Sequence, residues 1–345
     1  MSTQPHTSAL APAIEVKGLR HTYHSGHTAL DGVNLTCGVG LFGLLGPNGA
    51  GKSTLMRIIC TLIEPSEGQV RVGGHDVTQE RQRVREMLGY LPQDFGGWRL
   101  HRVEEVLDTL AQLSGMLDKK KRRARVAEVL HQVGLGDVAH RKVKKLSGGM
   151  VRRLGVAQAL VHEPKVLVVD EPTVGLDPEE RIRFRKLMAD IGRERTILLS
   201  THIVADLGAA CREIALLDDG QIVFQGPPRK LLELAEGRVF EITTSSVEAE
   251  LLESRHEVVS RSIANGQVTL RCVAPDRQLP PSASVVAEPT LEESYLAFMA
   301  ARGRTTAARQ DDEHLLEDDD KVEDDDRVED GDKVEAAAAD TKQAG

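Results

Sequence analysis

The chain has 345 residues, of which 40% are apolar and only 3% aromatic, enough for a large folded domain with a smaller one beside it. No stretch approaches the ~20 apolar residues of a membrane-spanning helix, and few rings are present to stack on the bases of nucleic acid. The net charge of −9 comes from residues 311–335, which hold fifteen acidic and three basic residues, so the rest of the chain carries +3.

The first predicted elements surround a glycine-rich loop. Residues 1–12 are expected to form a flexible leader; they lack the basic start and apolar centre of a secretory signal, so we expect a cytoplasmic chain. Alternating apolar residues predict a strand at 14–17, and an apolar run predicts another at 41–45. Leu55, Met56, Ile59 and Leu62 recur at helical spacing, which predicts a helix over 53–63.

Residues 46–54, Gly-Pro-Asn-Gly-Ala-Gly-Lys-Ser-Thr, join that strand to that helix and match a phosphate-binding loop. The glycines let backbone N–H groups converge on phosphate oxygens, and the helix N-terminus adds positive charge. Lys52 is expected to reach the β- and γ-phosphates of ATP, and Ser53 to hold Mg²⁺. The residues expected to bind the nucleotide here are Gly46, Asn48, Gly49, Gly51, Lys52, Ser53 and Thr54.

The middle of the chain is predicted to be rich in helices. Apolar stripes indicate helical structure throughout 103–133, with the basic run 119–125 between the stripes. We expect this run to be a solvated helix face; contact with a membrane surface or an acidic partner is the alternative. A further helix is predicted at 151–161, directly after the small-residue loop Leu146-Ser147-Gly148-Gly149-Met150, which provides a second anion-binding surface.

Short apolar runs at 166–169, 196–199 and 214–217 predict buried strands, and their alternation with helices predicts an α/β core with a mainly parallel sheet. Two acids end the first run: Asp170 is expected to bind Mg²⁺ and Glu171 to polarise the attacking water. Gln93 follows a predicted strand, and His202 follows the run at 196–199.

The C-terminal region changes in character after residue 228. A helix is predicted at 229–235, strands at 239–243, 258–263 and 268–273 with an Asn265-Gly266 hairpin turn, and a helix at 291–300 with Thr290 and Glu293 as its capping box. We expect a small α+β appendage over 236–302 and a disordered acidic tail over 303–345. The tail contains a six-residue acidic repeat at 317–334; a solvating role is expected, with weak cation or basic-partner binding as the alternative.

Together these motifs resemble the ATP-binding subunit of an ABC transporter. In the family's order they are Walker A at 46–54, the glutamine loop at Gln93, the signature at 146–150, Walker B at 166–171, the D-loop at 175–177 and the switch histidine His202. The resemblance covers 14–228 and implies a P-loop NTPase core with an antiparallel N-terminal β part. It also implies a helical subdomain at about 94–162, within an ATP-binding domain over 13–235.

The resemblance also implies the roles of individual residues. Two such domains pair head to tail, so that Ser147, Gly148 and Gly149 of one chain close over ATP held by the other. Glu171 acts as general base and His202 contacts the γ-phosphate. Gln93 joins Ser53 and Asp170 as a metal or water contact and faces the membrane partner. Tyr23 stands where the family stacks an aromatic ring on adenine; a strand residue packed in the core is the alternative.

The implied function is the ATPase motor of an exporter whose permease is a separate integral-membrane chain, with this subunit, in a homodimer, peripheral on the cytoplasmic face. Residues 290–296 and Met150, where the commonest family form has Gln, resemble a prokaryotic multidrug or antibiotic exporter group. The alternative is an ABC ATPase that acts on a soluble assembly complex. A GTP-dependent switch is excluded because the chain has no Asn-Lys-x-Asp loop.

Overall fold

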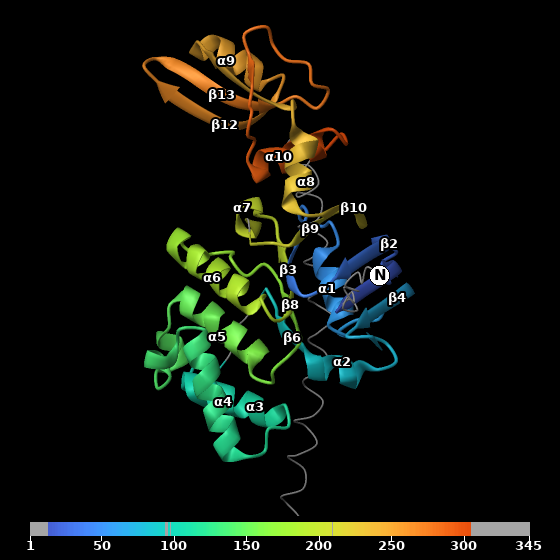
Figure 1. Cartoon of the computed structure of the whole chain (residues 1–345), viewed down its shortest axis with the longest axis vertical. Coiled ribbons are helices and arrows are strands. Elements are labelled where there is room, and N and C mark those ends of the chain that lie inside the picture. The colour runs from blue at the N-terminus through green and yellow to red at the C-terminus, as the bar shows by residue number, and fades with distance from the viewer. Residues whose placement is uncertain (1–12, 94–95, 97, 209, 305–345) are drawn as a thin grey trace, which may run out of the picture.

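A mainly parallel sheet forms the centre of the fold. The computed structural model describes residues 13–93, 96, 98–208 and 210–304, and within them this sheet has six strands in the order β10-β9-β3-β8-β7-β6 (Figure 1). All neighbours run parallel except β10, which pairs antiparallel with β9. The predicted α/β core is thereby confirmed. The strands are β3 (Gly40–Leu45), β6 (Leu88–Leu91), β7 (Val166–Val169), β8 (Thr196–Thr201), β9 (Glu213–Asp218) and β10 (Gln221–Gly226).

A second, antiparallel sheet lies beside the first at the N-terminal end of the chain. Its order is β2-β1-β4-β5, and α1 packs between it and the parallel sheet, with Leu55, Met56 and Ile59 buried. Helix α1 starts directly behind the phosphate loop, so this core fixes the loop's position. The elements are β1 (Ile14–Thr22), β2 (Thr28–Cys37), α1 (Lys52–Ile59), β4 (Glu67–Val72), β5 (His75–Asp76) and α2 (Arg81–Met87).

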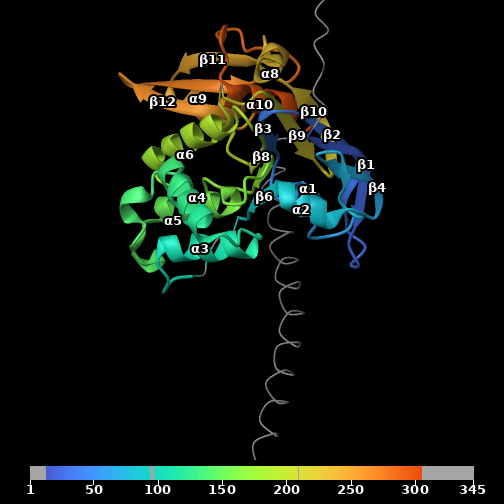
Figure 2. The ribbon, with the colours of Figure 1, turned by 60° about the horizontal axis from the view of Figure 1, so that its bottom comes forward.

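Helices α3 to α6 lie on the other side of the parallel sheet (Figure 2). Their apolar faces form one continuous core with β7 and β8, which are buried along their whole length. The elements are α3 (Val103–Leu113), α4 (Lys119–Gln132), the 3₁₀ turns η1 (Gly136–Val138) and η2 (Val143–Lys145), α5 (Gly148–Leu160), α6 (Pro178–Ile191) and α7 (Val204–Leu207).

Two predicted helices have different limits in the structure. The helix predicted over 53–63 ends at Ile59, because Thr61 adopts a positive φ of 62° that no α-helix tolerates. Leu62, predicted on its apolar stripe, is 56% exposed. The helical region predicted throughout 103–133 is two helices, α3 and α4, because the chain turns over 114–118 and Asp118 caps α4.

The basic run 119–125 was predicted to be a solvated face, and this is wrong for two of its arginines. The run forms the first two turns of α4, where Arg122 and Arg125 are buried. Arg122 Nε donates to Asp108 Oδ1 of α3 at 2.8 Å, and Arg125 Nη2 donates to the carbonyl of Leu160 at 2.7 Å. These bonds compensate the burial of the guanidinium groups and tie α4 to its two neighbours.

The C-terminal elements form a third, antiparallel sheet of order β12-β13-β11-β14 among the described residues. The predicted strands, the Asn265-Gly266 turn with positive φ at both residues, and the capping box of Thr290 and Glu293 are confirmed. Helix α9 and strand β14 were not predicted. The elements are α8 (Pro228–Ala235), β11 (Val239–Thr244), α9 (Ser246–Glu253), β12 (Glu257–Ala264), β13 (Gln267–Val273), β14 (Ser284–Val285) and α10 (Leu291–Ala300).

The predicted leader 1–12 and the acidic repeat lie outside the described residues, and the domain boundaries stay predictions. All four cysteines, which lie inside the described part, are buried and free. No helix in the described part combines the length and apolar character required to cross a membrane.

Candidate functional site

The phosphate loop connects β3 to α1 at the carboxyl end of the parallel strands. Two glycines are required there by close approach: a Cβ on Gly46 would lie 2.2 Å from the carbonyl oxygen of Leu217, and one on Gly51 would lie 2.3 Å from that of Ala29. Gly51 also has a φ of 97°, which L side chains rarely adopt. The loop therefore packs closely against the backbone of Leu217 on one side and of Ala29 on the other, and these contacts fix its shape before any ligand binds.

Lys52 turns its amine back over this loop. Its Nζ donates to the carbonyls of Gly46 at 2.8 Å and Pro47 at 2.9 Å, and lies 3.7 Å from Glu171 Oε1. The side chain is only 6% exposed, and burial lowers the pKa of the amine while Glu171 acts to raise it. The ammonium group is thus held at the point where the loop, β3 and the end of β7 converge.

Glu171 lies between this lysine and His202. Its Oε2 is 2.9 Å from His202 Nδ1, and its backbone N–H donates to Ser200 Oγ at 3.0 Å. The residue has a φ of 43°, an unusual backbone conformation for a non-glycine residue and one often found at functional sites. The predicted Lys52, Glu171 and His202 are therefore assembled into one connected group.

The electrostatics of this group favour an ionised carboxylate. Burial acts to raise the pKa of Glu171, but the hydrogen bond from His202 and the charge of Lys52 outweigh it and hold the pKa below its usual range. The hydrogen bond to Glu171 raises the pKa of His202 above 6.5, against the effect of its partial burial. An ionised Glu171 is the form able to accept a proton at neutral pH.

We expect the His202–Glu171 pair to stabilise the fold most at mildly acidic pH. The pKa of His202 is raised in the folded chain. The contribution of protonated His202 to the free energy of unfolding is therefore complete below pH 6.5 and is lost as pH rises through the folded pKa. The depressed pKa of Glu171 keeps the carboxylate charged in that range. Thermal unfolding should show a larger loss of Tm for His202→Gln at pH 6 than at pH 9.

A double variant separates the effect of losing the His202–Glu171 interaction from the other effects of His202→Gln on Tm. In a Glu171→Gln background, His202→Gln should cost the same Tm at both pH values, because the charged partner is gone. If the pH dependence of the difference persists in that background, Glu171 is not its cause.

Asp170 and Ser53 form the predicted metal-binding pair. Asp170 is 3% exposed, and its carboxylate accepts a hydrogen bond from Ser200 Oγ at 2.5 Å. Burial raises the pKa of Asp170, and the hydroxyl groups of Ser200 and Ser53 counteract this rise. A carboxylate and a hydroxyl oxygen beside a phosphate loop are ligands that fit Mg²⁺, which takes the rest of its shell from phosphates and water.

The signature loop, residues 146–150, opens helix α5 away from the phosphate loop. Ser147 is the N-cap, and its Oγ accepts from the N–H of Met150 at 3.3 Å. Ser147 and Gly148 are exposed, while Gly149 is buried, with no room for a Cβ beside Glu180. Among the described contacts of Ser147, Gly148 and Gly149, none is a hydrogen bond to Lys52, Ser53 or Thr54.

Gln93 lies on the signature side of the molecule. With Gly148, Arg152 and Leu176 it lines a groove of about 420 Å³. Its carbonyl accepts from Arg152 Nη1 at 2.6 Å, and that of Pro92 accepts from the same atom at 3.3 Å. Among the described contacts, the Gln93 side chain has no hydrogen bond to Ser53 or Asp170. The structure thus brings Gln93 to the signature loop rather than to the other metal-binding candidates.

Tyr23 follows the end of β1 and lies close to the phosphate loop. It is half-buried, its hydroxyl is 3.0 Å from Thr54 Oγ1, and its ring meets His21 edge-on with centroids 4.7 Å apart. Two of the predicted nucleotide-binding residues, Tyr23 and Thr54, are therefore neighbours. Its stacking on adenine stays a prediction.

Sequence reasoning missed two polar contacts that support the site. Ser200 bonds both Asp170 and the N–H of Glu171, and the buried Asp206 of α7 accepts from Thr173 Oγ1 just beyond Glu171. Ser200 had a signal, because it is a polar residue that directly follows the apolar residues 197–199 and precedes the Thr201-His202 pair. Asp206 had none, since its partner lies 33 residues away.

Comparison with known proteins finds relatives along much of the chain. Residues 30–174 match the family "ABC transporter". The chain is 37% identical over 260 residues to the daunorubicin/doxorubicin resistance ATP-binding protein DrrA of Streptomyces peucetius, covering 74% of this chain and 77% of that one.

Two further relatives are matched over less of their length. The uncharacterized ABC transporter ATP-binding protein YxlF of Bacillus subtilis is 36% identical over 58% of this chain and 66% of its own. The probable multidrug ABC transporter ATP-binding protein YbhF of Escherichia coli is 34% identical over 66% of this chain and 38% of its own. The chain thus spans less than two thirds of these two relatives.

Solved structures with the same fold are also found. One is cbiO1 from Clostridium perfringens, part of the ABC transporter complex cbiONQ, with a TM-score of 0.61, 27% identity, and coverage of 65% of this chain and 92% of that one. Another is the dimeric post-hydrolysis state of the ATP-binding cassette MJ0796 bound to ADP and Pi, with a TM-score of 0.57, 27% identity, and coverage of 62% and 98%.

Proposed function

Because this chain belongs to the family of ABC transporter ATP-binding proteins, we propose that it is the ATP-hydrolysing motor subunit of an ABC exporter. ATP bound at the phosphate loop drives two copies together head to tail, and hydrolysis lets them separate. The export direction is supported by the names of the relatives, which include drug-resistance and multidrug proteins.

The observation that carries this proposal is the connected group of Lys52, Glu171 and His202. Lys52 binds the β- and γ-phosphates once it exchanges its contacts with Gly46 and Pro47 for phosphate oxygens. Glu171 accepts a proton from the attacking water, and His202 both orients this carboxylate and contacts the γ-phosphate. Gln93 contributes to catalysis from the groove it shares with the signature loop.

We propose Mg²⁺ as the metal that accompanies ATP, held by Ser53 and Asp170. When bound, it neutralises charge on the transferred phosphoryl group. Ser200 positions Asp170 for this role through its 2.5 Å hydrogen bond. Gln93 is retained as a third, more distant contact to the metal or its water shell.

A second copy of the chain completes the site in this proposal. Ser147 and Gly148 are exposed at a helix N-terminus, where free N–H groups favour a phosphate, yet none of their described contacts is a hydrogen bond to Lys52, Ser53 or Thr54 of their own chain. Head-to-tail pairing brings them over the nucleotide of the partner, and Tyr23 stacks on the adenine.

The remaining partner is an integral-membrane permease formed by other chains, which places this subunit at the cytoplasmic face of the membrane. The cargo is selected by that permease. Direct support would come from purifying the chain out of native membranes and identifying the integral-membrane protein that accompanies it.

The motor function is tested by measuring the rate of ATP hydrolysis in the presence of Mg²⁺ as a function of protein concentration. If two chains are needed per active site, the rate per chain should rise with protein concentration and then level off as the dimer forms. A rate per chain that is constant over the whole range, together with a monomer in the presence of ATP, would contradict the proposal.

A further inference from the structure

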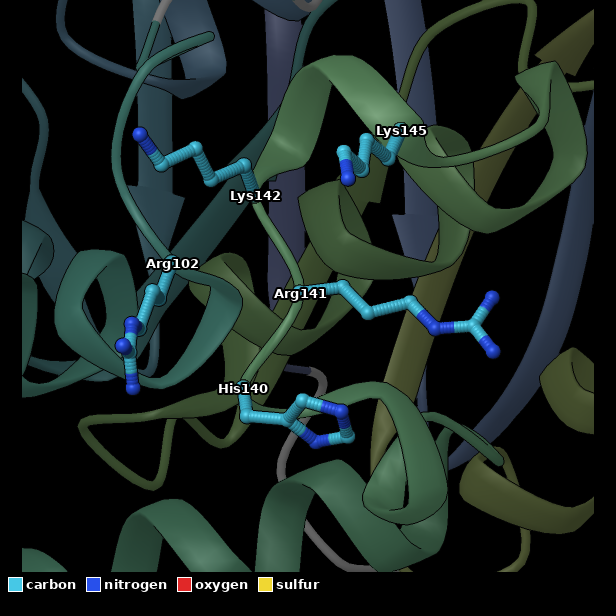
Figure 3. A pocket seen from close by; sticks show the side chains of 5 residues that line it. All are labelled: Arg102, His140, Arg141, Lys142 and Lys145. Atoms are coloured by element: carbon cyan, nitrogen blue, oxygen red, sulfur yellow. The ribbon is translucent and has the colours of Figure 1, made fainter.

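A basic pocket lies where the start of α3 meets the segment that precedes the signature loop (Figure 3). It has a volume of about 540 Å³, and every side chain that lines it is basic and exposed. Within the described part of the chain, the ion pairs of the lining residues are two loose ones of Arg102, at 3.9 Å from Glu104 and Glu105. The five lining residues, here called the basic pocket, are Arg102, His140, Arg141, Lys142 and Lys145.

The basic pocket is held together by backbone hydrogen bonds. The N–H of Val103 donates to the carbonyl of Arg141 at 3.0 Å, and the N–H of Val143 donates to that of His101 at 3.0 Å. Arg102 and Lys142 face each other across this short antiparallel bridge. The backbones of these two basic residues are thus held side by side, while their charged ends point in different directions (Figure 3).

Two other arginines in the helical part of the chain form ion pairs with acidic residues. Arg122 bonds Asp108 of α3, and Arg153 of α5 lies 3.6 Å from Glu180 of α6. By contrast, Arg141, Lys142 and Lys145 form no ion pair within the described part of the chain. The basic pocket therefore carries a surplus of positive charge on a preformed surface, which is a recognition site for a polyanion.

The chain itself contains a polyanion of opposite charge. Residues 317–334 read Glu-Asp-Asp-Asp-Lys-Val, Glu-Asp-Asp-Asp-Arg-Val and Glu-Asp-Gly-Asp-Lys-Val, so the three repeats offer four, four and three carboxylates. We propose that the basic pocket binds the acidic repeat of its own chain. The motor function proposed above neither requires this contact nor explains it.

The length of the intervening chain allows this contact. Thirteen residue steps separate Arg304, the last described residue, from Glu317, and thirty separate it from Val334. At ~3.3 Å per extended residue, the far end of the repeat reaches up to ~100 Å from Arg304. A folded part of about 290 residues has a radius of gyration of only ~19 Å, so the pocket lies within reach.

Tethering favours this occupant over free anions. A ligand joined to its site by a linker competes at an effective concentration of about 1 mM, whereas a free polyanion must reach that concentration in solution.

Zero-length carbodiimide cross-linking of the full chain tests the proposal. The reagent joins a lysine amine to a carboxylate only where the two touch, and peptide mass spectrometry identifies the pair. We expect the amines of Lys142 and Lys145 to be joined to carboxylates of residues 317–334 in the monomeric product. The yield should fall by about tenfold between low salt and 0.5 M salt, because exposed ion pairs are screened.

Matched variants make the test specific to the pocket. Arg102→Gln with Arg141→Gln removes two pocket charges but keeps both reporter lysines, and should lower their cross-linking by about fivefold or more. Lys119→Gln with Arg123→Gln removes two exposed charges from α4 and should change it by less than about twofold. Equal Tm values for the three proteins would show that the fold is intact.

Several results would overturn the proposal. One is an equal cross-linking yield at Lys119 and Lys120, which would mean that the repeat contacts any basic surface. Another is cross-linking found only between two copies, in the dimeric product. A third is the absence of cross-links combined with binding to anionic lipid vesicles that the pocket variant loses, which would identify a lipid headgroup as the occupant.

Discussion

Glu171→Gln is expected to bind ATP with near-normal affinity and to hydrolyse it at least about 100-fold more slowly, because the amide cannot accept the proton of the attacking water. The substitution keeps the shape of the side chain and its distance of 2.9 Å from His202, while it removes the negative charge facing Lys52. The measurement is single-turnover ATP hydrolysis alongside nucleotide affinity. Light scattering with ATP should show a long-lived dimer.

The control for this variant is Glu179→Gln, which neutralises an exposed glutamate of α6 that forms an ion pair with Arg183. It should hydrolyse ATP within about twofold of the unmodified chain, since an exposed ion pair contributes little. If Glu171→Gln retained its hydrolysis rate, the proton acceptor would have to be another group. If it stayed monomeric with ATP, the head-to-tail arrangement would be wrong.

Lys52→Ala is expected to lower nucleotide affinity by about 10- to 100-fold, which corresponds to the loss of charge-assisted hydrogen bonds to phosphate. Turnover should fall below detection, because the same ammonium group stabilises the transferred phosphoryl charge. Equilibrium binding of a fluorescent ATP analogue, together with phosphate release, measures both effects.

The buried position of Lys52 demands a control for folding. Its removal also takes away a partner of Glu171, so Tm must be measured with and without nucleotide. Lys186→Ala on the exposed face of α6 serves as the matched lysine variant and should leave both affinity and turnover unchanged. An unaltered ATPase rate in Lys52→Ala would remove the phosphate-binding assignment of residues 46–54.

The features that the sequence predicted well are those with a local cause. Strands β7 and β8 are buried on both faces, so each appears as an uninterrupted apolar run. The phosphate loop needs glycine where an added Cβ would lie 2.2–2.3 Å from a backbone carbonyl oxygen, and that demand is visible as a fixed glycine spacing. The cap of α10 follows likewise from Thr290 and Glu293, three residues apart.

The features that it missed depend on partners far along the chain. Arg125 looked like a solvated residue because its burial comes from the carbonyls of Leu160 and Val161, 35 and 36 residues away. The end of α1 at Ile59 follows from the turn at Thr61, which no apolar pattern marks. The position of Gln93 beside the signature loop likewise depends on Arg152, which is 59 residues away.

The contacts of Arg152 couple residues 92–93 to helix α5. The Nη1 atom of Arg152 donates hydrogen bonds to the carbonyls of both Pro92 and Gln93. The backbone of Arg152 lies in the first turns of α5, the helix that Ser147 begins. We expect a displacement of residues 92–93 to be transmitted through this contact to the first turns of α5.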